Sequence, residues 1–250
     1  MNEQELIRKR LMDLSRQANR KGIVLFSDFL NLNELNIYHQ SEKLFETKTE
    51  SFGGVPFAER QMIAFLPDAL YYAWNYPITA FCIKPSYPKF AEKLGHRDIL
   101  GSIMNLGVDR SKIGDIIPGN GVWYLLCAEN VADYFKENLT KIRHTLVTLE
   151  ECQPEEIRDT QTPDELTGIV TSNRLDSMIA CVYKLSRSQS LELFRQEKVF
   201  VNGRITTSVT YACRPGDVIS VRGFGRFVYE SVQGETNKGR LKFHYRLYRN

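Results

Sequence analysis

Arginine and lysine side chains stand beside the expected helix starts and tight turns in the last third of this sequence. Arg174 and Arg187 each begin an expected helix, where the helix dipole disfavours a positive charge. Something other than helix stability should therefore favour arginine there. Guanidinium forks and helix N–H groups both bind phosphate oxygens, so the arrangement predicts a grip on a nucleic-acid backbone. Other candidate contacts in the same segment, at the end of the second helix or near turns, are Lys198, Arg204, Arg222 and Arg226.

The distribution of charge along the chain agrees with this prediction. Residues 172–250 contain 14 Lys and Arg against 6 Asp and Glu, a net charge of +8. The remainder, residues 1–171, contains 19 basic and 24 acidic residues, a net charge of −5. Such asymmetry indicates a C-terminal part that binds a polyanion, joined to a weakly acidic body.

Patterns that would signal catalysis or metal binding are weak. Five cysteines contain no C-x-x-C pair, so neither a zinc site nor a disulfide framework is indicated. His96-Arg97-Asp98 resembles a kinase catalytic loop, but no D-F-G accompanies it, and Asp98 is expected to cap a helix. Arg174-Leu175-Asp176 resembles the tripeptide of pseudouridine synthases without the stretch that follows it there. We expect no catalytic residue, no metal and no cofactor.

Composition sets the broad class. Hydrophobic residues make up 42% and charged residues 25% of the 250 residues, which allows a packed core. No apolar run reaches the roughly 18 residues that cross a bilayer, and the N-terminus lacks a signal-peptide apolar region. We expect a cytoplasmic monomer without membrane contact.

Two helices and a small twisted sheet are expected over residues 172–250. The first helix, capped by Thr171 or Ser172, carries apolar residues at helical spacing, namely Leu175, Met178, Ile179, Val182 and Leu185. Ser186 is expected to cap the second helix. Asn202-Gly203 predicts a two-residue hairpin, and Gly223 and Gly225 allow positive φ at the last turn.

The rest of the chain predicts two further domains and a linker, which gives an α+β fold class. Residues 1–75 are expected to be mainly helical. Residues 76–150 predict the order β-α-β-β-α-β, a ferredoxin-like or RRM-like layout with a hairpin turned at residues 118–121 and a helix over residues 98–108. Residues 151–171 are acidic, contain two prolines and lack a period, so we interpret them as a linker.

Four ordered motifs bring a resemblance to a known domain. They are Arg174-Leu175-Asp176, Ser186-Arg187-Ser188, Val199-x-Val201-Asn202-Gly203 and Gly216-Asp217-Val218-Ile219-Ser220-Val221. This segment resembles the small RNA-binding domain of ribosomal protein S-four, the αL domain. The resemblance implies RNA contact by Arg174, Arg187, Ser188, Gln189 and the Asn202 turn. It also implies that Asp176 holds an arginine in place rather than touching RNA.

The whole chain resembles the YlmH family of bacterial RNA-binding proteins. The match rests on FGGVPFAER, HRDILGSIMNLGVDRSKIGDI and VRGFGRF. The resemblance implies binding to ribosomal RNA of the large subunit beside a peptidyl-tRNA, and rescue of obstructed large subunits in ribosome-associated quality control. The central domain would supply a second RNA contact, at Arg97, Arg110 and Lys112.

Two other functions remain open from the residues alone. One is an RNA-modifying enzyme with an unrecognised centre in residues 50–150. The other is an interaction protein in cell division, for which RNA binding would be incidental.

We expect RNA affinity to fall steeply with salt, because about four to seven phosphates would be neutralised and their counterions released. Titration with ribosomal RNA over a series of salt concentrations measures the slope. A flat dependence would contradict an electrostatic grip.

Overall fold

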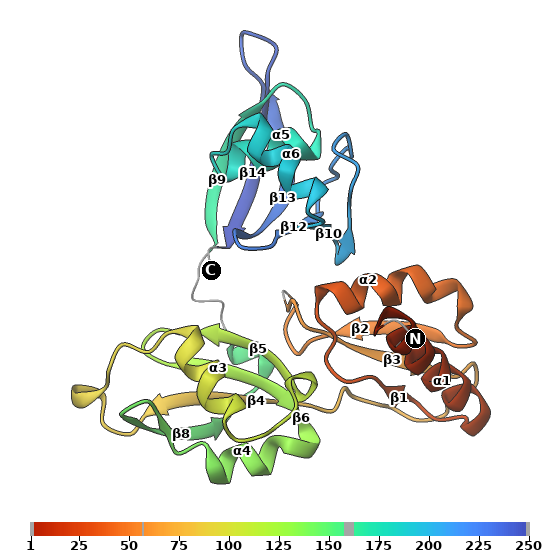
Figure 1. Cartoon of the computed structure of the whole chain (residues 1–250), viewed down its shortest axis with the longest axis vertical. Coiled ribbons are helices and arrows are strands. Elements are labelled where there is room, and N and C mark those ends of the chain that lie inside the picture. The colour runs from red at the N-terminus through yellow and green to blue at the C-terminus, as the bar shows by residue number, and fades with distance from the viewer. Residues whose placement is uncertain (1–2, 57, 158–162, 249–250) are drawn as a thin grey trace. The chain divides into compact units, whose positions relative to one another are not determined.

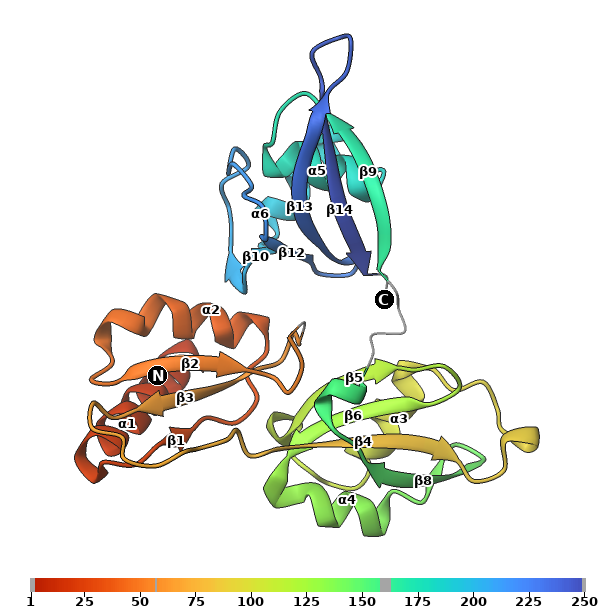
Figure 2. The same cartoon turned by 180° about the vertical axis from the view of Figure 1, so that it is seen from behind.

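The computed structural model describes residues 3–56, 58–157 and 163–248, and confirms the α+β class. The chain divides into two compact units, residues 1–160 and 161–250, each with its own helices and sheets (Figures 1 and 2). The two units are described separately below.

The N-terminal part of unit 1 contains a three-stranded sheet as well as helices. Its elements are α1 (Glu3–Lys21), β1 (Leu25–Phe26), α2 (Leu32–Ser41), the short 3₁₀ helix η1 (Glu42–Leu44), β2 (Lys48–Phe52) and β3 (Met62–Leu66). The strand order is β1-β3-β2, with both pairs antiparallel. Gly22, with φ of 65°, follows the last residue of α1.

The second part of unit 1 has the strand and helix order that the sequence predicts, with β7 added. Its elements are β4 (Ile78–Pro85), η2 (Pro88–Phe90), α3 (His96–Met104), η3 (Arg110–Lys112), β5 (Ile113–Pro118), β6 (Trp123–Ala128), η4 (Glu129–Val131), α4 (Ala132–Asn138), β7 (Lys141–Ile142), β8 (Thr145–Glu151) and η5 (Pro154–Glu156). The five strands lie in the order β5-β6-β4-β8-β7. We call this part, residues 78–157, the central domain.

Asp98 does not cap α3 in the way the sequence suggested. The helix begins two residues earlier, at His96, after Gly95. Asp98 lies in the first turn, where its carboxylate accepts a hydrogen bond from the Gly95 N–H at 2.8 Å. The carboxylate still closes the helix start, but from inside the helix.

Helices α3 and α4 cover one face of the central sheet, through residues such as Ile99, Ile103 and Phe135. On the other face, Val55, Ala58 and Ile157 pack against apolar residues of β4, β5 and β6, namely Ile78, Ala80, Ile117, Tyr124 and Leu126. Burial on both sides explains why these three strands read as apolar runs. Strand β8 alternates instead, because its residues on the second face are exposed, namely Leu146, Thr148 and Glu150.

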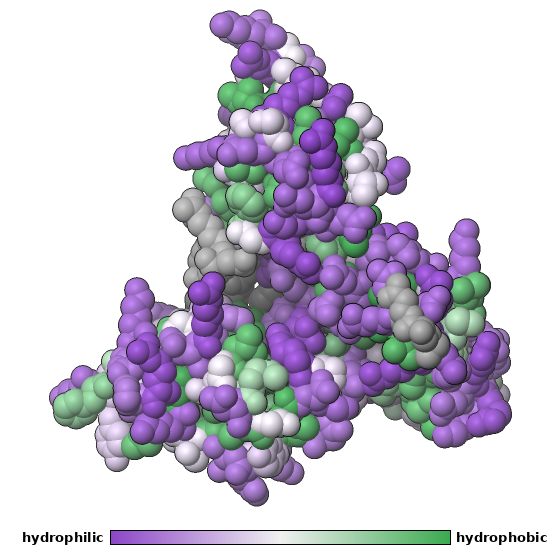
Figure 3. Space-filling model, in the orientation of Figure 1, coloured by the Kyte–Doolittle hydropathy of each residue, from purple (hydrophilic) through white to green (hydrophobic). Residues whose placement is uncertain are grey.

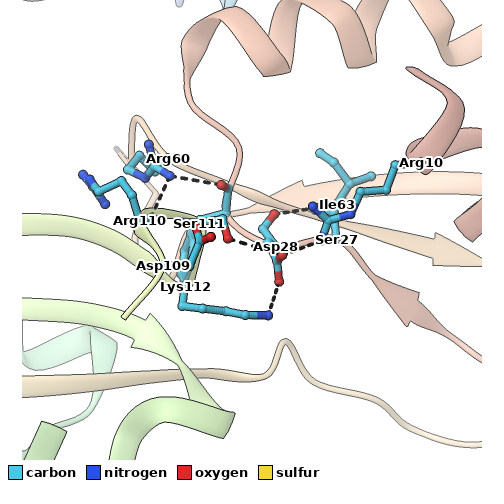
Figure 4. Close-up of polar contacts among 10 residues, drawn as sticks. Arg10, Ser27, Asp28, Arg60, Ile63, Asp109, Arg110, Ser111 and Lys112 are labelled. Carbon is cyan, nitrogen blue, oxygen red and sulfur yellow. Dashed lines mark hydrogen bonds and ion pairs between the residues drawn. The ribbon is translucent and has the colours of Figure 1, made fainter. Parts of the chain in front are cut away.

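The two parts of unit 1 are joined by buried polar contacts (Figure 4). The Arg60 guanidinium donates to the backbone oxygens of Phe29, Arg110 and Ile113 at 2.8–3.1 Å. The Asp115 carboxylate accepts from the backbone N–H groups of Glu59 and Arg60. Because a half-buried charge without partners is costly, these bonds fix the segment before β3 against β5.

Asp28 makes a second junction in the same place. Its carboxylate pairs with Lys112 at 2.5 Å and with Arg10 of α1 (Figure 4). Partial burial acts to raise the pKa of Asp28, but the hydrogen bonds and charges of Lys112 and Arg10 outweigh it and lower that pKa.

Unit 2 has two helices packed on a six-stranded sheet. Its elements are β9 (Asp164–Val170), α5 (Leu175–Val182), α6 (Arg187–Arg195), β10 (Val199–Val201), β11 (Arg204–Ile205), β12 (Val218–Val221), β13 (Gly225–Glu235) and β14 (Leu241–Tyr248). The strand order is β11-β10-β12-β13-β14-β9. The apolar stripe predicted for the first helix is buried, with Leu175, Met178 and Ile179 fully enclosed.

The predicted linker is wrong over residues 164–170, which form β9 and pair with β14. Leu166, Gly168 and Val170 face inward, while the residues between them are exposed. Gly168 lies against the ring of Phe243, where a Cβ atom would come within 2.3 Å of the ring. The acidic residues that suggested a linker therefore lie on the outward face of an edge strand. The small residue Gly168 is there because the Phe243 ring leaves no room for a side chain.

The predicted hairpin turns are correct. Asn202 and Gly203 have φ of 51° and 77°, the pair of positive values that a type I′ turn requires. Gly223 and Gly225 have φ of 88° and 106° at the turn between β12 and β13. The turn at residues 118–121 likewise joins β5 to β6.

Replacing Asp28 with Asn should lower the free energy of unfolding of unit 1 by about 1–2 kcal/mol at pH 7, because both ion pairs are lost. A carboxylate with a lowered folded pKa stabilises the fold above its ordinary value of 3.8, and this contribution disappears as pH falls through the folded value. The difference between wild type and variant should therefore shrink below pH 3.8.

Urea unfolding followed by tryptophan fluorescence measures this, because both tryptophans, Trp74 and Trp123, lie in unit 1. Asp68→Asn, at an exposed loop position, is the matched control. Equal stability of the two variants at pH 7 would show that the Asp28 junction contributes nothing.

Candidate nucleic-acid interface

The starts of α5 and α6 are joined, and this brings the two predicted arginines to one end of the helix pair. The Ser190 hydroxyl of α6 donates to the Asp176 backbone oxygen of α5 at 2.9 Å. Arg174 is the N-cap residue of α5, and Arg187 is the first residue of α6. In Figure 1, α5 and α6 lie side by side over the sheet.

Arg174 is held by Asp176, as the resemblance implied. Its Nε and Nη2 donate to the two carboxylate oxygens of Asp176 at 3.1 and 2.9 Å. Asp176 is 5% exposed, whereas Arg174 is partly open to solvent. The hydrogen bonds that Arg174 donates to Asp176 raise the pKa of Arg174. The pair thus fixes a permanently charged guanidinium that is partly open to solvent.

The N–H groups at the start of α5 are not open to phosphate, which corrects the sequence interpretation. The Leu175 and Asp176 N–H groups donate to the backbone oxygens of Tyr211 and Val209 at 2.9 and 3.2 Å. The loop before β12 therefore caps this helix, and neither Thr171 nor Ser172 does so. Anion binding here depends on side chains and not on the helix backbone.

The start of α6 follows the prediction more closely. Ser186 is its N-cap, and the Ser186 hydroxyl accepts from the Gln189 N–H at 3.3 Å. The Gln189 side-chain oxygen accepts from the Ser186 N–H at 2.9 Å, which completes a capping box. The Ser188 and Ser186 hydroxyls are 3.0 Å apart. Gln189 thus has a structural bond, while Arg187 is exposed and pairs with no carboxylate among the described residues.

Asn202 is exposed, but its side chain is engaged in hydrogen bonds within unit 2. Its side-chain nitrogen donates to Asp217 Oδ1, and its side-chain oxygen accepts from the Val218 N–H, both at 2.9 Å. Asp217 also accepts from the Tyr211 hydroxyl at 3.1 Å and from the Arg214 N–H at 2.8 Å. The motif residues Asn202 and Asp217 therefore build the loop that caps α5.

The other predicted cations of unit 2 lie at turns and strand starts. Arg222 lies 5.9 Å from the centre of the Phe200 ring, and Arg226 lies 4.7 Å from that of Tyr248. Lys198 precedes β10, and Arg204 begins β11 and is exposed. The face of unit 2 that carries α5 and α6 is mainly hydrophilic in Figure 3. A phosphate surface of this kind needs no enclosed pocket.

Two of the three cations predicted for the central domain are used internally. Arg110 donates to the Ile113 backbone oxygen at 2.7 Å, and Lys112 pairs with Asp28. Burial, with the charge of Arg60 beside it, lowers the pKa of Arg110 to about 10, so it remains charged at neutral pH. Arg97, in contrast, is exposed.

The sequence interpretation missed the tip of the long β13–β14 hairpin. Lys238 and Arg240 line a shallow hollow there with Ile169, Thr236 and Asn237. The sequence does mark this tip, because Lys238 and Arg240 flank Gly239, a turn glycine with φ of 68°. The tip projects from the body of unit 2 (Figures 1 and 2).

Two buried cysteines of the described residues are poor nucleophiles. Burial raises the pKa of Cys127 and of Cys213 to about 12, so both are unreactive thiols at neutral pH. Within residues 3–56, 58–157 and 163–248, no group of three or more His, Cys, Asp or Glu side chains is arranged to hold a metal ion. No helix of these residues is both long and apolar enough to cross a membrane.

Comparison with known proteins agrees with the sequence motifs. Residues 74–156 match the family described as a putative RNA-binding domain in YlmH. A Bacillus subtilis (strain 168) protein, named ribosome-associated protein quality control protein P2, is 28% identical over 192 residues, which cover 76% of this chain and 74% of that protein. The solved structure of the cell division protein ylmH from Streptococcus pneumoniae matches with a TM-score of 0.52 and 24% identity. That match covers 64% of this chain and 96% of the other, and concerns the fold. The resemblance to the YlmH family is confirmed.

Replacing Asn202 with Ala should destabilise unit 2 by about 1–3 kcal/mol, because Asp217 loses a donor and the Val218 N–H loses its acceptor. Alanine also tolerates the positive φ at this position less well. Hydrogen exchange of peptides from residues 199–221 should become faster. Arg187→Ala is the control and should leave exchange unchanged. Unchanged exchange in Asn202→Ala would show that Asn202 does not hold this loop.

Proposed function

We propose that this chain, a YlmH-like protein, is a ribosome-associated RNA-binding factor without catalytic activity. Its unit 2 is then an S-four-type RNA-binding domain, extended by β9 and by the long β13–β14 hairpin. The observation that carries the proposal is the joined start of α5 and α6, where Arg174 and Arg187 are fixed at one end of a helix pair. The B. subtilis relative, by its name, associates with the ribosome in protein quality control.

Folded ribosomal RNA suits such a surface. RNA helices display phosphates and 2′-hydroxyls more readily than base edges, so recognition relies on shape and charge. Arg174 and Arg187 would bind phosphates, and the Ser188 hydroxyl and Gln189 amide would add polar contacts to the ribose. Lys198, Arg204, Arg222 and Arg226 extend the positive surface, and Asn202 contributes by holding the capping loop.

The finer proposal is that the chain binds ribosomal RNA of the large subunit beside a peptidyl-tRNA, and acts in the rescue of obstructed large subunits. A charged, shallow surface fits a large RNA partner better than a small substrate, which would require an enclosed pocket. We further propose that it acts as a cytoplasmic monomer.

Absence of catalysis is part of the proposal and is supported by the local chemistry. Asp98, in the kinase-like tripeptide, accepts a hydrogen bond from the Gly95 N–H and lies 3.6 Å from Arg143. Asp176, in the synthase-like tripeptide, is buried and bound by Arg174. Neither carboxylate is therefore presented as a nucleophile or a general base.

The proposal predicts that the chain sediments with large ribosomal subunits in a sucrose gradient, and that Arg174→Ala/Arg187→Ala does not. Loss of two charge-assisted contacts should weaken binding by about tenfold or more. The matched control is Arg8→Ala/Arg20→Ala, which removes two exposed charges from α1 in unit 1.

Arg174→Ala leaves the buried Asp176 without its ion pair, so a folding defect must be separated from a lost contact. The single variant Arg187→Ala breaks no internal bond and should still weaken sedimentation. If wild-type protein stays at the top of the gradient at low salt, even with subunits that carry peptidyl-tRNA, ribosome binding is wrong.

A further inference from the structure

Part of the sheet face that RRM domains use is covered in the central domain. In RRM domains, aromatic residues on the open sheet face stack on RNA bases. Here Val55 and Ala58 from the preceding segment and Ile157 from the following one pack over β4, β5 and β6. Gly54, with φ of 93°, lies close enough to Leu126 that a Cβ atom would come within 3.0 Å. The β8 residues exposed on this face, Leu146, Thr148 and Glu150, include no aromatic ring. Stacking on bases in this domain therefore needs rings outside the covered part of the face.

Two aromatic rings instead stand exposed at the end of the sheet, in the loop that follows β4. Tyr87 is 64% and Phe90 is 86% exposed, and neither packs against another aromatic ring of the described residues. Apolar side chains are visible at this outer end of the central domain in Figure 3. Exposed aromatic rings of this size forfeit the stabilisation that burial would give them, so their position calls for an external partner.

The loop that carries the rings is ordered by its own bonds and by the β7–β8 hairpin. Phe90 N–H donates to the Tyr87 oxygen at 3.1 Å, which closes a single 3₁₀ turn that begins at Pro88. Ser86 N–H donates to the Leu146 oxygen at 2.9 Å, and Glu92 N–H donates to the Thr145 hydroxyl at 3.1 Å. The rings are thus presented on a pre-organised turn, which lowers the entropy lost on binding.

The surroundings of the rings are positively charged. Arg143 lies 3.6 Å from both Glu92 and Asp98, and its single charge offsets one of these two carboxylates. The cations that remain are exposed and pair with no carboxylate among the described residues, and they are Lys89, Lys93, Arg97 and Lys141. Exposed rings among unpaired cations are the combination that binds single-stranded nucleic acid.

We propose that Tyr87 and Phe90 form a stacking platform for bases of single-stranded RNA, whose phosphates are bound by Lys89, Lys93 and Lys141. This inference rests on the proposed function, because it assumes an RNA partner, but it assigns a separate site and a separate kind of RNA. Unit 2 binds folded RNA by charge, whereas this platform binds unpaired bases by their faces. Sequence preference is weak, because every base offers a π face.

The test is binding of a labelled, mixed-sequence 12-nucleotide single-stranded RNA to the full chain, measured by fluorescence anisotropy. Tyr87→Ala/Phe90→Ala should weaken binding by at least about tenfold, since each stacked base contributes to affinity. Tyr71→Ala is the matched control, because Tyr71 is 94% exposed outside the platform. An abasic oligomer of equal length should bind wild type and double variant equally, because it keeps the phosphates and lacks the bases.

A second readout detects stacking directly and does not depend on the loss of a side chain. In Phe90→Trp, tryptophan emission should be quenched when the RNA binds, whereas the added emission of Tyr71→Trp should not change. Equal binding of the 12-mer by wild type and Tyr87→Ala/Phe90→Ala, or failure of wild type to bind it, overturns the platform.

These outcomes are distinct from failure of the proposed function. Sedimentation with large subunits depends on Arg174 and Arg187, and it can succeed while the platform fails. If the double variant keeps 12-mer binding but loses sedimentation, the exposed rings dock on protein, and the RNA assignment is overturned.

Discussion

The buried carboxylate of Asp217 holds together the segments that position the candidate RNA contacts. It accepts hydrogen bonds from Asn202 at the β10–β11 turn, from the Tyr211 hydroxyl and from the Arg214 N–H. The loop fixed in this way caps the start of α5, where Arg174 stands. The hydrogen bond from the Ser190 hydroxyl to the Asp176 backbone oxygen then fixes α6, which begins at Arg187, against α5. The positions of the candidate RNA contacts thus depend on a buried carboxylate that is not itself one of them.

Residues with the chemistry to bind RNA divide into those the fold uses and those it leaves exposed. Arg110 and Lys112 are engaged in internal bonds, because half-buried polar groups need partners. Asn202 is exposed and still bonds to Asp217. Arg187 and Arg97 are exposed at the surface. Aromatic residues of the central domain divide in the same way. Tyr124 packs against the apolar cluster on one face of the sheet, whereas Phe90 is exposed to solvent.

In unit 1, the segment before β3 covers part of the central sheet. Gly54 lies against Leu126 and Ile78 of one sheet face, and the bonds of Arg60 and Asp115 fix the segment in place. The apolar area so buried stabilises the unit. The exposed rings of Tyr87 and Phe90 lie in the loop after β4, which is the middle strand, and therefore at the end of the sheet and outside this cover.

The sequence by itself determined the α+β class, the order of elements in the central domain, the two helices of unit 2 and the turns at Asn202-Gly203 and Gly223. These features follow from local periodicity, capping residues and positive φ, which a short stretch of chain encodes. Tertiary structure alone decided that residues 164–170 form an edge strand, that the loop before β12 caps α5, and that Arg110 and Lys112 are occupied. The Arg110 side chain bonds a backbone oxygen only three residues away, at Ile113. The other three features depend on partners distant in the chain, and periodicity carries no information about which distant group will satisfy a buried donor or charge.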